Sequence, residues 1–595
     1  MDTLAQMFLN TIKAYPKPDM MLYKEEGEYK PISTEEFKNR VIHLSLGLQE
    51  LGLKKGDKLV ILAENCPEWV ITDLAHICLG GITVPIYTSL VPEQIKYVIN
   101  NSDAKAVFCS DLSLWEKVNF VKDKLNKVEN FIVMGAKAPE GTVLLSEVTE
   151  RGKKLFEKEP ELFEKTASKI EAEDIASIIY TSGTTGTPKG VMLTHSNFIS
   201  NSLATASIIE FTAKDTVLSF LPLSHVLERM VTFTYLYKGC SIAYAESIET
   251  VAENLLEVKP HIMVSVPRVF EKIYAKVMDN VLEGSALKRK IFFWSIKIGK
   301  QYAQKELNKE KIPKWLSFRR NVAEKLVFSK IVSRTGGRVR FFVSGGAPLS
   351  KDIAEFFYGM GLVVLEGYGL TESSPVIAVN TLEELKFGSV GKPIPGVTVK
   401  IADDGEILAK GPNIMKGYYK AEEETEEVLK QGWLHTGDIG YLDEDSFLYI
   451  TDRKKDIIVT AGGKNIAPQM IENQLKTNPF ISNVVIIGDK KRFISALIVP
   501  TFEKLEEYAK ASGIEYKSLK DLVENEKIIN FMMSEIDRYS ANFATYERVK
   551  KIILLDGDFE IEKGELTPSL KVRRNIVEDK YKDKIDKLYQ DGSFQ

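Results

Sequence analysis

Strand-like and helix-like segments alternate through much of the first third of this chain. Short apolar runs rich in β-branched residues are each followed by a longer stretch that suits a helix. The strand-like runs are residues 58–63, 82–87 and 104–109, and the helix-like ones are residues 67–79 and 92–100. Because neighbouring parallel strands need a crossover between them, this alternation predicts parallel sheets covered by helices on both faces. With 595 residues, the chain is long enough for several folding units.

The last third of the chain has a different pattern. Residues 440–451 are predicted to form two strands joined by an Asp/Glu turn, and five charged residues follow at 452–456. The segments after this interruption are a helix and two strands, at residues 468–476, 484–487 and 495–499. We predict a mixed α/β, multidomain fold. An N-terminal domain (1–452) holds helix-covered sheets and a β subdomain, and a small α+β domain (453–595) follows. The alternative is an ordinary charged loop within one domain.

Composition excludes several classes of protein. A net charge of −4 gives no general reason to expect nucleic-acid binding. The four cysteines are far apart, which argues against a zinc site or a disulfide framework and fits a reducing cytosol. The start of the chain does not resemble a signal peptide, and no apolar stretch approaches the roughly 20 residues of a membrane-spanning helix. We therefore expect a cytoplasmic protein that at most sits on a membrane surface.

Residues 180–190, YTSGTTGTPKG, form the most informative motif. Glycines let backbone N–H groups turn toward one point, hydroxyls add donors, and Lys189 adds positive charge, as in loops that hold phosphate oxygens. Strand-like runs flank it at 175–180 and 191–195. It is not a Walker loop, because Pro188 precedes the lysine and Gly190 follows it. The alternative is a flexible surface hairpin.

This loop resembles the phosphate loop of the adenylate-forming enzymes, the superfamily of acyl-CoA synthetases, luciferases and peptide-synthetase adenylation domains. Further segments resemble that superfamily in the order in which it uses them. They are residues 341–349, 366–373, 433–438, 453–466 and 564–574. The resemblance implies an ATP site formed by Thr181, Ser182, Gly183, Thr184, Thr185, Gly186, Thr187, Lys189, Gly345, Gly346, Ala347, Glu366, Gly367, Tyr368, Gly369, Thr371, Asp438, Arg453 and Lys571.

The resemblance also implies individual roles for residues of this site. Tyr368 would stack on adenine, Thr371 would bond the α-phosphate, and Glu372 would be a ligand and catalytic partner of Mg²⁺ through a hard carboxylate oxygen. A carboxylate can accept two hydrogen bonds at once, which suits Asp438 for the two ribose hydroxyls, with Arg453 donating to the same sugar.

The C-terminal segments resemble the parts of the superfamily that move. Lys455 falls on the hinge position, and Gly462, Gly463 and Lys464 would line the passage by which the thiol of coenzyme A enters. Lys571 aligns with the catalytic lysine that clamps the carboxylate and the α-phosphate. Leu570 stands where the superfamily usually has glycine, a variant typical of long-chain enzymes. The alternative for Lys571 is a solvated lysine in a basic tail.

Residues 220–230, FLPLSHVLERM, resemble the long-chain fatty acyl-CoA synthetase branch in their His-x-x-Glu-Arg element. His225 would then act where the carboxyl group of the acid enters. The alternative is a satisfied core histidine. An insertion at about 270–338 is also typical of that branch. Its residues 288–330, here called the basic lobe, carry thirteen Lys or Arg against three Glu, a local charge of +10.

The basic lobe also holds seven aromatic residues, and two interpretations of it remain open. They are Phe292, Phe293, Trp294, Tyr302, Trp315, Phe318 and Phe328. Basic helices with exposed aromatics can dock on anionic lipid, which suggests a peripheral contact at the inner face of the membrane. Alternatively, the aromatics pack inward and the basic face is solvated.

The resemblance implies an ATP-dependent ligase that forms acyl-AMP from a long-chain fatty acid and transfers the acyl group to coenzyme A, with Mg²⁺ as cofactor. Two alternatives within the superfamily are an acyl-acyl carrier protein synthetase and a fatty acyl-AMP ligase with another acceptor. A phosphate-loop ATPase or kinase would release ADP instead of AMP. An inactive lipid-binding scaffold is disfavoured by the intact site residues. The sequence leaves the oligomeric state open.

Overall fold

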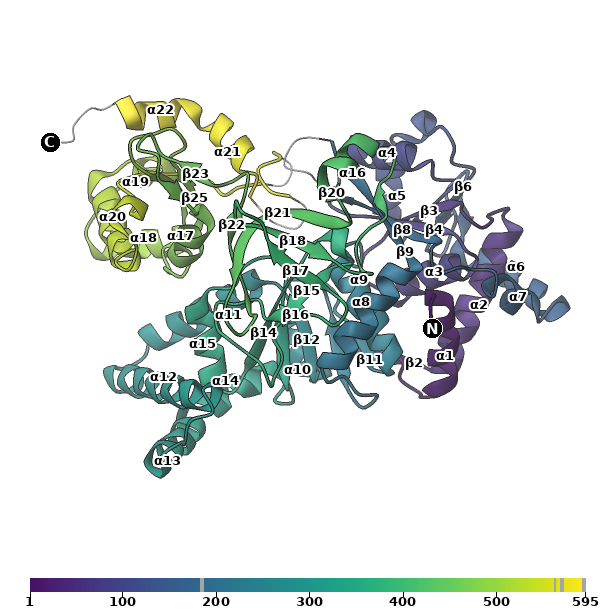
Figure 1. The fold of residues 1–595 in the computed structure, drawn as a ribbon, viewed down its shortest axis with the longest axis horizontal. Coiled ribbons are helices and arrows are strands. Elements are labelled where there is room, and N and C mark those ends of the chain that lie inside the picture. Colours follow the sequence, from purple (N-terminus) through teal and green to yellow (C-terminus); the bar gives the residue numbers. More distant parts are fainter. Residues whose placement is uncertain (182–186, 561–562, 568–571, 591–595) are drawn as a thin grey trace.

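Two large sheets, parallel in most of their pairings, form the centre of the N-terminal domain (Figure 1). The computed structural model describes residues 1–181, 187–560, 563–567 and 572–590. The first sheet has eight strands in the order β19-β9-β8-β4-β3-β5-β6-β7. These are β3 (Lys58–Leu62), β4 (Ile82–Ile86), β5 (Ala106–Cys109), β6 (Asn130–Val133), β7 (Val143–Leu144), β8 (Ile175–Thr181), β9 (Lys189–Thr194) and β19 (Gly417–Tyr418).

The second sheet has nine strands in the order β16-β15-β14-β13-β12-β10-β11-β1-β2. These are β1 (Met21–Glu25), β2 (Glu28–Ile32), β10 (Thr216–Ser219), β11 (Ser241–Tyr244), β12 (Ile262–Ser265), β13 (Phe341–Ser344), β14 (Val363–Gly369), β15 (Val376–Val379) and β16 (Lys392–Pro393). In both sheets the central strands pair in parallel and antiparallel pairs lie toward an edge. The alternation of strands and helices therefore predicted the sheet centres correctly.

Helices surround the two sheets of the N-terminal domain, and two clusters of buried apolar residues fill it. These helices are α1 (Leu4–Ala14), α2 (Thr34–Glu50), α3 (Pro67–Cys78), α4 (Pro92–Ser102), α5 (Leu112–Asn119), α6 (Leu145–Lys158), α7 (Leu162–Ala167), α8 (His195–Ile208), α9 (Val226–Lys238), α10 (Val251–Val258), α11 (Pro267–Leu282), α12 (Ala286–Leu307), α13 (Lys314–Ala323), α14 (Ser329–Val332), α15 (Lys351–Gly359) and α16 (Glu422–Val428). Strands such as β5, in which every residue is buried, have the continuous apolar sequence expected of a sheet covered on both faces.

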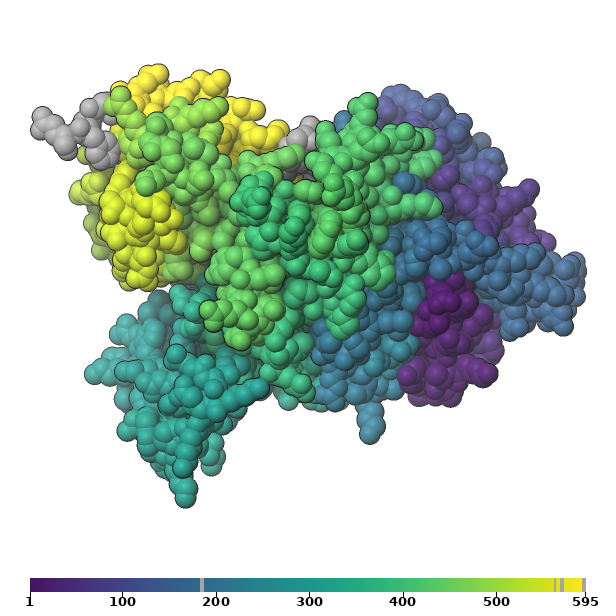
Figure 2. All heavy atoms as spheres, in the orientation of Figure 1, coloured from purple at the N-terminus to yellow at the C-terminus, as the bar shows by residue number. Residues whose placement is uncertain are grey.

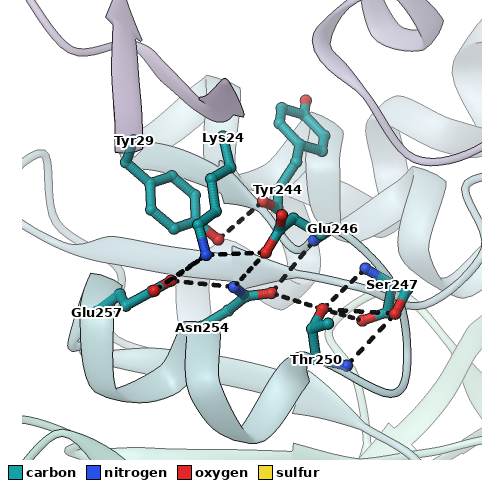
Figure 3. Close-up of polar contacts among 8 residues, drawn as sticks. All are labelled: Lys24, Tyr29, Tyr244, Glu246, Ser247, Thr250, Asn254 and Glu257. Atoms are coloured by element: carbon teal, nitrogen blue, oxygen red, sulfur yellow. Dashed lines mark hydrogen bonds and ion pairs between the residues drawn. The ribbon is translucent and has the colours of Figure 1, made fainter. Parts of the chain in front are cut away.

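The hairpin β1–β2 at the edge of the second sheet is tied to the segment after β11 and to α10 by a polar network (Figure 3). Lys24 Nζ lies 2.9 Å from a carboxylate oxygen of Glu246 and 2.9 Å from one of Glu257, which belongs to α10. Hydrogen bonds to the two glutamates raise the pKa of Lys24, and the bond to Glu246 contributes most. Asn254 donates to both carboxylates and so holds them on either side of the lysine.

A small antiparallel β subdomain follows the second sheet. Its strands are β17 (Thr398–Ile401), β18 (Glu406–Lys410), β20 (Leu429–Lys430), β21 (Trp433–Leu442) and β22 (Leu448–Arg453). The turn between β21 and β22 contains the predicted acidic residues, with Lys386 bound to Asp443 and Asp445. The β subdomain is therefore confirmed, and its strands β21 and β22 carry two of the predicted site residues.

The smaller C-terminal domain has two clusters of buried apolar residues and its own sheets. Its strands are β23 (Ile458–Val459), β24 (Asn465–Ile466), β25 (Ile481–Ile487), β26 (Ser495–Pro500) and β27 (Lys551–Leu554). Its helices are α17 (Pro468–Leu475), α18 (Phe502–Ala511), α19 (Leu519–Val523), α20 (Glu526–Tyr539), α21 (Arg574–Lys580) and α22 (Lys582–Gln590). The large and small domains of the predicted fold class are present, while the boundary between residues 452 and 453 stays a prediction. Among the described helices, none combines the length and the apolar character needed to span a membrane.

Candidate active site

The ends of the Gly/Thr-rich loop are fixed by a β-hairpin. Strands β8 and β9 pair antiparallel, with Thr181 opposite Lys189. Strand β19, more than 200 residues further along the chain, pairs with β9 and places Tyr418 opposite Val191. Lys189 Nζ lies 5.3 Å from the centre of the Tyr418 ring, and the Tyr418 hydroxyl donates to Glu372 Oε1 at 2.8 Å. The side chains of Lys189, Tyr418 and Glu372 therefore lie next to one another, although they come from three distant segments of the chain.

The interior of the loop cannot be compared with its prediction. Ser182, Gly183, Thr184, Thr185 and Gly186 lie outside the described residues. Thr187 is described and exposed, on the side of the loop that leads into β9.

A second cluster joins Tyr368, Asp438 and Arg453. Pairing of β21 with β22 places Asp438 opposite Arg453, and Arg453 Nε lies 3.2 Å from Asp438 Oδ1. The Tyr368 hydroxyl, at the end of β14, donates to Asp438 Oδ2 at 2.7 Å. Burial opposes the charge of Arg453, but the nearby carboxylates of Asp438 and Glu372 outweigh it and raise its pKa. The charge of Glu372 acts on Arg453, so the two clusters lie near each other.

Three glycines lie where the backbone turns or packs closely beside these clusters. Gly346, in the turn after β13, has φ +80°, a conformation that glycine adopts without strain. A Cβ on Gly345 would lie 3.0 Å from Leu227. At Gly369 a Cβ would lie 1.8 Å from the carbonyl oxygen of Pro375, so glycine is required there. Gly345, Gly346, Ala347, Gly367 and Gly369 were all predicted, and they follow or end neighbouring strands of one sheet.

Glu366 lies inside the fold beside this turn. Ser344 of β13 is its partner in the parallel ladder, and the side chain is buried. Burial raises the pKa of Glu366 to about 8, opposed by hydrogen bonds from the backbone N–H groups of Leu349 and Gly388. Burial therefore disfavours the charged form of this carboxyl group, and the two N–H donors favour it.

Thr371 and Glu372 lie on a short 3₁₀ turn, Thr371–Ser373, directly after β14. The amide of Asn413 donates to the carbonyl oxygen of Ser373 at 2.9 Å, and Met415 N–H donates to that of Glu372 at 2.8 Å. Backbone contacts from the segment that leads into β19 therefore position the Glu372 carboxylate next to Tyr418.

His225 caps the N-terminus of α9. Its Nδ1 accepts a hydrogen bond from the N–H of Leu227 at 3.1 Å, and Leu227 lies against Gly345. The imidazole is half-buried, so it is neither a core histidine nor a surface one. The fold thus places Leu227, whose N–H is bound by His225, against the Gly-rich turn.

The other charged residues of the same motif have a structural role in the core. Arg229 and Asp73 of α3 are each 1% exposed, and Arg229 Nε and Nη2 bind the two carboxylate oxygens at 2.8 and 2.6 Å. Arg229 also donates to Ser177 of β8, so it links both helices to the first sheet. Glu228 accepts from Ser219 at 2.6 Å, and burial raises its pKa to about 8.

The residues predicted for the hinge and the thiol passage lie at the start of the C-terminal domain. Lys455 is in the turn after β22, and the preceding Lys454 binds Asp404 and Glu406 of the β subdomain. Gly462, Gly463 and Lys464 form the exposed turn between β23 and β24, where Gly463 has φ +72°. Lys464 contacts Tyr546 of the same domain, its Nζ lying 5.6 Å from the ring centre.

Lys571 lies outside the described residues. Described residues on either side of it contact one another. Leu566 and Val572 form an antiparallel bridge, and the N–H of Arg573 donates to the carbonyl oxygen of Glu565 at 2.7 Å. Arg574 is not a solvated tail residue, because its guanidinium binds Glu472 at 2.6 Å and is 18% exposed.

Two residues of this region were missed by the sequence analysis. Tyr418 lies between Lys189 and Glu372, a contact that depends on the pairing of β19 with β9. Asp452, predicted as part of a charged interruption, is 1% exposed and accepts the N–H of Gln469 at 2.9 Å at the start of α17. Burial raises its pKa to about 6. No local pattern announces either contact, since the partners are distant in sequence.

Comparison with known proteins gives consistent results over the whole chain. The family model "AMP-binding enzyme" matches residues 10–419, and the model "AMP-binding enzyme C-terminal domain" matches residues 455–593. Long-chain-fatty-acid--CoA ligase FadD15 of Mycobacterium bovis is 35% identical over 580 residues, covering 96% of this chain and 95% of the relative. Long-chain-fatty-acid--CoA ligase 5 of Rattus norvegicus is 32% identical over 624 residues, covering 99% and 88%.

A solved structure supports the fold. The anthranilate CoA ligase AuaEII in complex with anthranoyl-AMP superposes with a TM-score of 0.75 and 18% identity, covering 98% of each chain. At this identity the likeness concerns the fold alone.

Proposed function

The chain belongs to the AMP-binding enzyme family, and from this we propose that it is an ATP-dependent long-chain fatty acid:CoA ligase. It activates the acid as acyl-AMP, releases pyrophosphate, and transfers the acyl group to coenzyme A. The carrying observation is the nearly full-length similarity, above 30%, to relatives named long-chain-fatty-acid--CoA ligases. The convergence of Lys189, Glu372, Tyr368, Asp438 and Arg453 in one site agrees with it.

Charge neutralisation is the main chemical task of such a site. A carboxylate that attacks the α-phosphate of ATP brings two anions together, and positioned positive charge lowers that cost. We assign Lys189 to the phosphates, Thr371 to the α-phosphate, and Lys571 to both the carboxylate and the α-phosphate. The described and undescribed loop residues 181–187 would add hydroxyl and N–H donors.

The nucleoside would occupy the second cluster. The Tyr368 ring is available for adenine while its hydroxyl binds Asp438, and the Asp438–Arg453 pair offers one acceptor and several donors to the ribose. The Gly345–Gly346–Ala347 turn and the Glu366–Gly369 strand end allow the base to approach the backbone closely.

Mg²⁺ is the cofactor that fits Glu372. The ion is commonly held by one or two carboxylates together with substrate phosphates, so a single carboxylate in this position is sufficient. The Tyr418 hydroxyl binds Oε1 and thereby fixes the orientation of the carboxylate. When bound, the ion would supply charge that offsets the negative phosphates.

We expect Glu372→Gln to raise the Mg²⁺ concentration needed for half-maximal turnover by about 10- to 100-fold, because the amide loses the anionic oxygen. Tyr418→Phe should shift it in the same direction by less. Turnover is measured by pyrophosphate release across a Mg²⁺ titration. Glu427→Gln, on the exposed face of α16, is the matched control and should behave as wild type. An unchanged Mg²⁺ dependence in Glu372→Gln would remove this residue as a ligand.

We assign His225 to the carboxyl end of the acid, since it caps the N-terminus of α9 and the adjacent Leu227 lies against the Gly-rich turn. Lys455 is proposed as the hinge about which the C-terminal domain rotates, and Gly462, Gly463 and Lys464 as contacts of coenzyme A. The location of these residues on turns at the start of that domain supports the assignment.

The acyl acceptor is tested by supplying coenzyme A as the sole thiol with ATP, Mg²⁺ and oleate. Oleoyl-CoA detected by mass spectrometry supports the ligase. Transfer to an acyl carrier protein but not to coenzyme A would instead favour the carrier-protein alternative, and accumulation of oleoyl-AMP with both would favour a fatty acyl-AMP ligase.

We further propose a cytoplasmic location with a peripheral contact at the inner face of the membrane. The four cysteines are free thiols, which suits a reducing compartment. The long-chain acid partitions into bilayers because each methylene favours an apolar environment, so the substrate would be collected from a membrane surface.

A further inference from the structure

The seven aromatic residues of the basic lobe divide into two groups. Phe292 and Phe328 are buried, and Trp294 and Tyr302 are partly buried, so four of the seven pack inward. Phe293, Trp315 and Phe318 are 46%, 53% and 68% exposed. Neither of the two sequence interpretations therefore describes the whole segment, because the lobe has an inner aromatic core and a separate outer aromatic surface.

The outer surface follows one face of α13. Its exposed residues are Trp315, Phe318 and Leu326, and Leu326 is 47% exposed. Their spacings in sequence are close to multiples of the helical repeat, which places them on one face. The helix continues through residues 324–328 in a π-helical turn, so Leu326 extends the same stripe. The opposite face of the helix buries Leu316 and Ala323. An ordinary surface helix buries its apolar stripe, whereas this one has a second stripe that it exposes.

The packing of α13 explains why this stripe points outward. Arg320, on the inner side, lies 4.6 Å from the ring centre of Phe328 and pairs with Glu324. The inner face is thus already occupied by contacts within the lobe. Trp315 has Arg319 over its ring at 5.2 Å, so a basic group accompanies the exposed indole.

The positive charge of the lobe is mostly uncompensated. Of its thirteen basic residues, three have an ion pair among the described parts of the chain, namely Lys300, Lys305 and Arg320. The exposed Lys314, Arg319 and Lys325 are next to the apolar residues of the stripe in sequence. A protein with a net charge of −4 therefore presents a local surface of opposite sign that also carries aromatic rings.

The lobe projects from the body of the molecule. Figure 1 shows α12 and α13 extending away from the sheets, and Figure 2 shows their atoms as a separate protrusion at the lower left. A flat surface could therefore reach the tip of the lobe before it met the rest of the N-terminal domain.

We propose that the tip of the basic lobe is a docking surface for an anionic lipid bilayer, with Trp315, Phe318 and Leu326 entering the headgroup region. Lys314, Arg319 and Lys325 contact the lipid phosphates around them. Charge complementarity selects anionic lipid, and the exposed aromatic stripe distinguishes a bilayer from an acidic protein, which would need no apolar insertion. Docking would bring the site close to fatty acids in the bilayer, which rests on the proposed function. The lipid contact itself does not depend on the identity of the substrate.

The test measures binding of the full chain to vesicles by co-sedimentation. Vesicles of phosphatidylcholine alone are compared with vesicles that also contain phosphatidylglycerol, at low and high salt. We expect binding to the anionic vesicles that weakens as salt increases, and at least about tenfold weaker binding by Trp315→Ser/Phe318→Ser. Phe120→Ser is the matched control, because Phe120 is 74% exposed on a different part of the domain.

The same variants are assayed for ligase activity with detergent-dispersed oleate, which needs no bilayer. Normal activity with reduced vesicle binding separates docking from the chemistry and also shows that the variant is folded. Equal binding to neutral and anionic vesicles, absence of binding to both, or wild-type binding by the double variant would each overturn the proposal. Absence of ligase activity in the wild-type chain would instead concern the proposed function.

Discussion

Lys571→Ala is expected to slow acyl-AMP formation by about 10²- to 10³-fold while leaving thioester formation from supplied acyl-AMP nearly unchanged. The reason is electrostatic. In the first half-reaction a carboxylate approaches an anionic phosphate, and the loss of one positioned cationic donor costs a factor of this order. In the second, the acyl group is already activated and the proposed rotation at Lys455 presents a different face of the C-terminal domain.

The two half-reactions can be measured separately. Acyl-AMP formation is followed by pyrophosphate release without coenzyme A, and thioester formation by adding coenzyme A to synthetic acyl-AMP. Lys563→Ala is the matched control, because it removes an exposed lysine from the same segment, where it pairs with Glu560. An equal loss of both half-reactions in Lys571→Ala would contradict the proposal that the C-terminal domain rotates between the two half-reactions.

The largest effect on stability is expected at the buried pair of Asp73 and Arg229. Asp73→Asn should lower the free energy of unfolding by about 3–5 kcal/mol, because it leaves the guanidinium buried without a compensating charge. Both side chains are 1% exposed, so water cannot replace the lost carboxylate. Denaturant unfolding followed by tryptophan fluorescence measures the loss, since the Trp69 ring centre lies 5.8 Å from the guanidinium carbon.

Two further variants check the cause of this loss. The double variant Asp73→Leu/Arg229→Met removes both charges and should recover much of the lost stability. Glu161→Gln breaks the exposed pair with Lys165 and should cost less than about 1 kcal/mol. Wild-type stability of Asp73→Asn would show that the ion pair does not hold the two helices to the first sheet.

Local patterns predicted the regular elements well. The hairpin that carries the Gly/Thr-rich loop was recognisable because its two apolar strands and its turn are adjacent in sequence. The observed strands β8 and β9 differ from the predicted ranges by one or two residues at their ends. Helix α3 was predicted one residue too long, because the apolar periodicity of a sequence does not mark the residue at which a helix ends.

Contacts between distant segments could not be predicted in the same way. Arg229 and Asp73 are 156 residues apart, and the sequence indicates a charged motif at Arg229 without its partner. Asp452 looked like part of a solvated loop because its neighbours are charged, yet it is buried against α17. Such contacts follow from how the helices pack on the sheets, which the spacing of residues along the chain does not encode.

The most direct test of the proposed activity is a measurement of pyrophosphate release. The protein is supplied with ATP, Mg²⁺ and a series of acids from acetate to oleate, with and without coenzyme A. We predict release that is greatest with long chains, with AMP as the nucleotide product and acyl-CoA as the thioester. Absence of release with every acid, or ADP in place of AMP, would contradict the assignment of this site to fatty-acid adenylation.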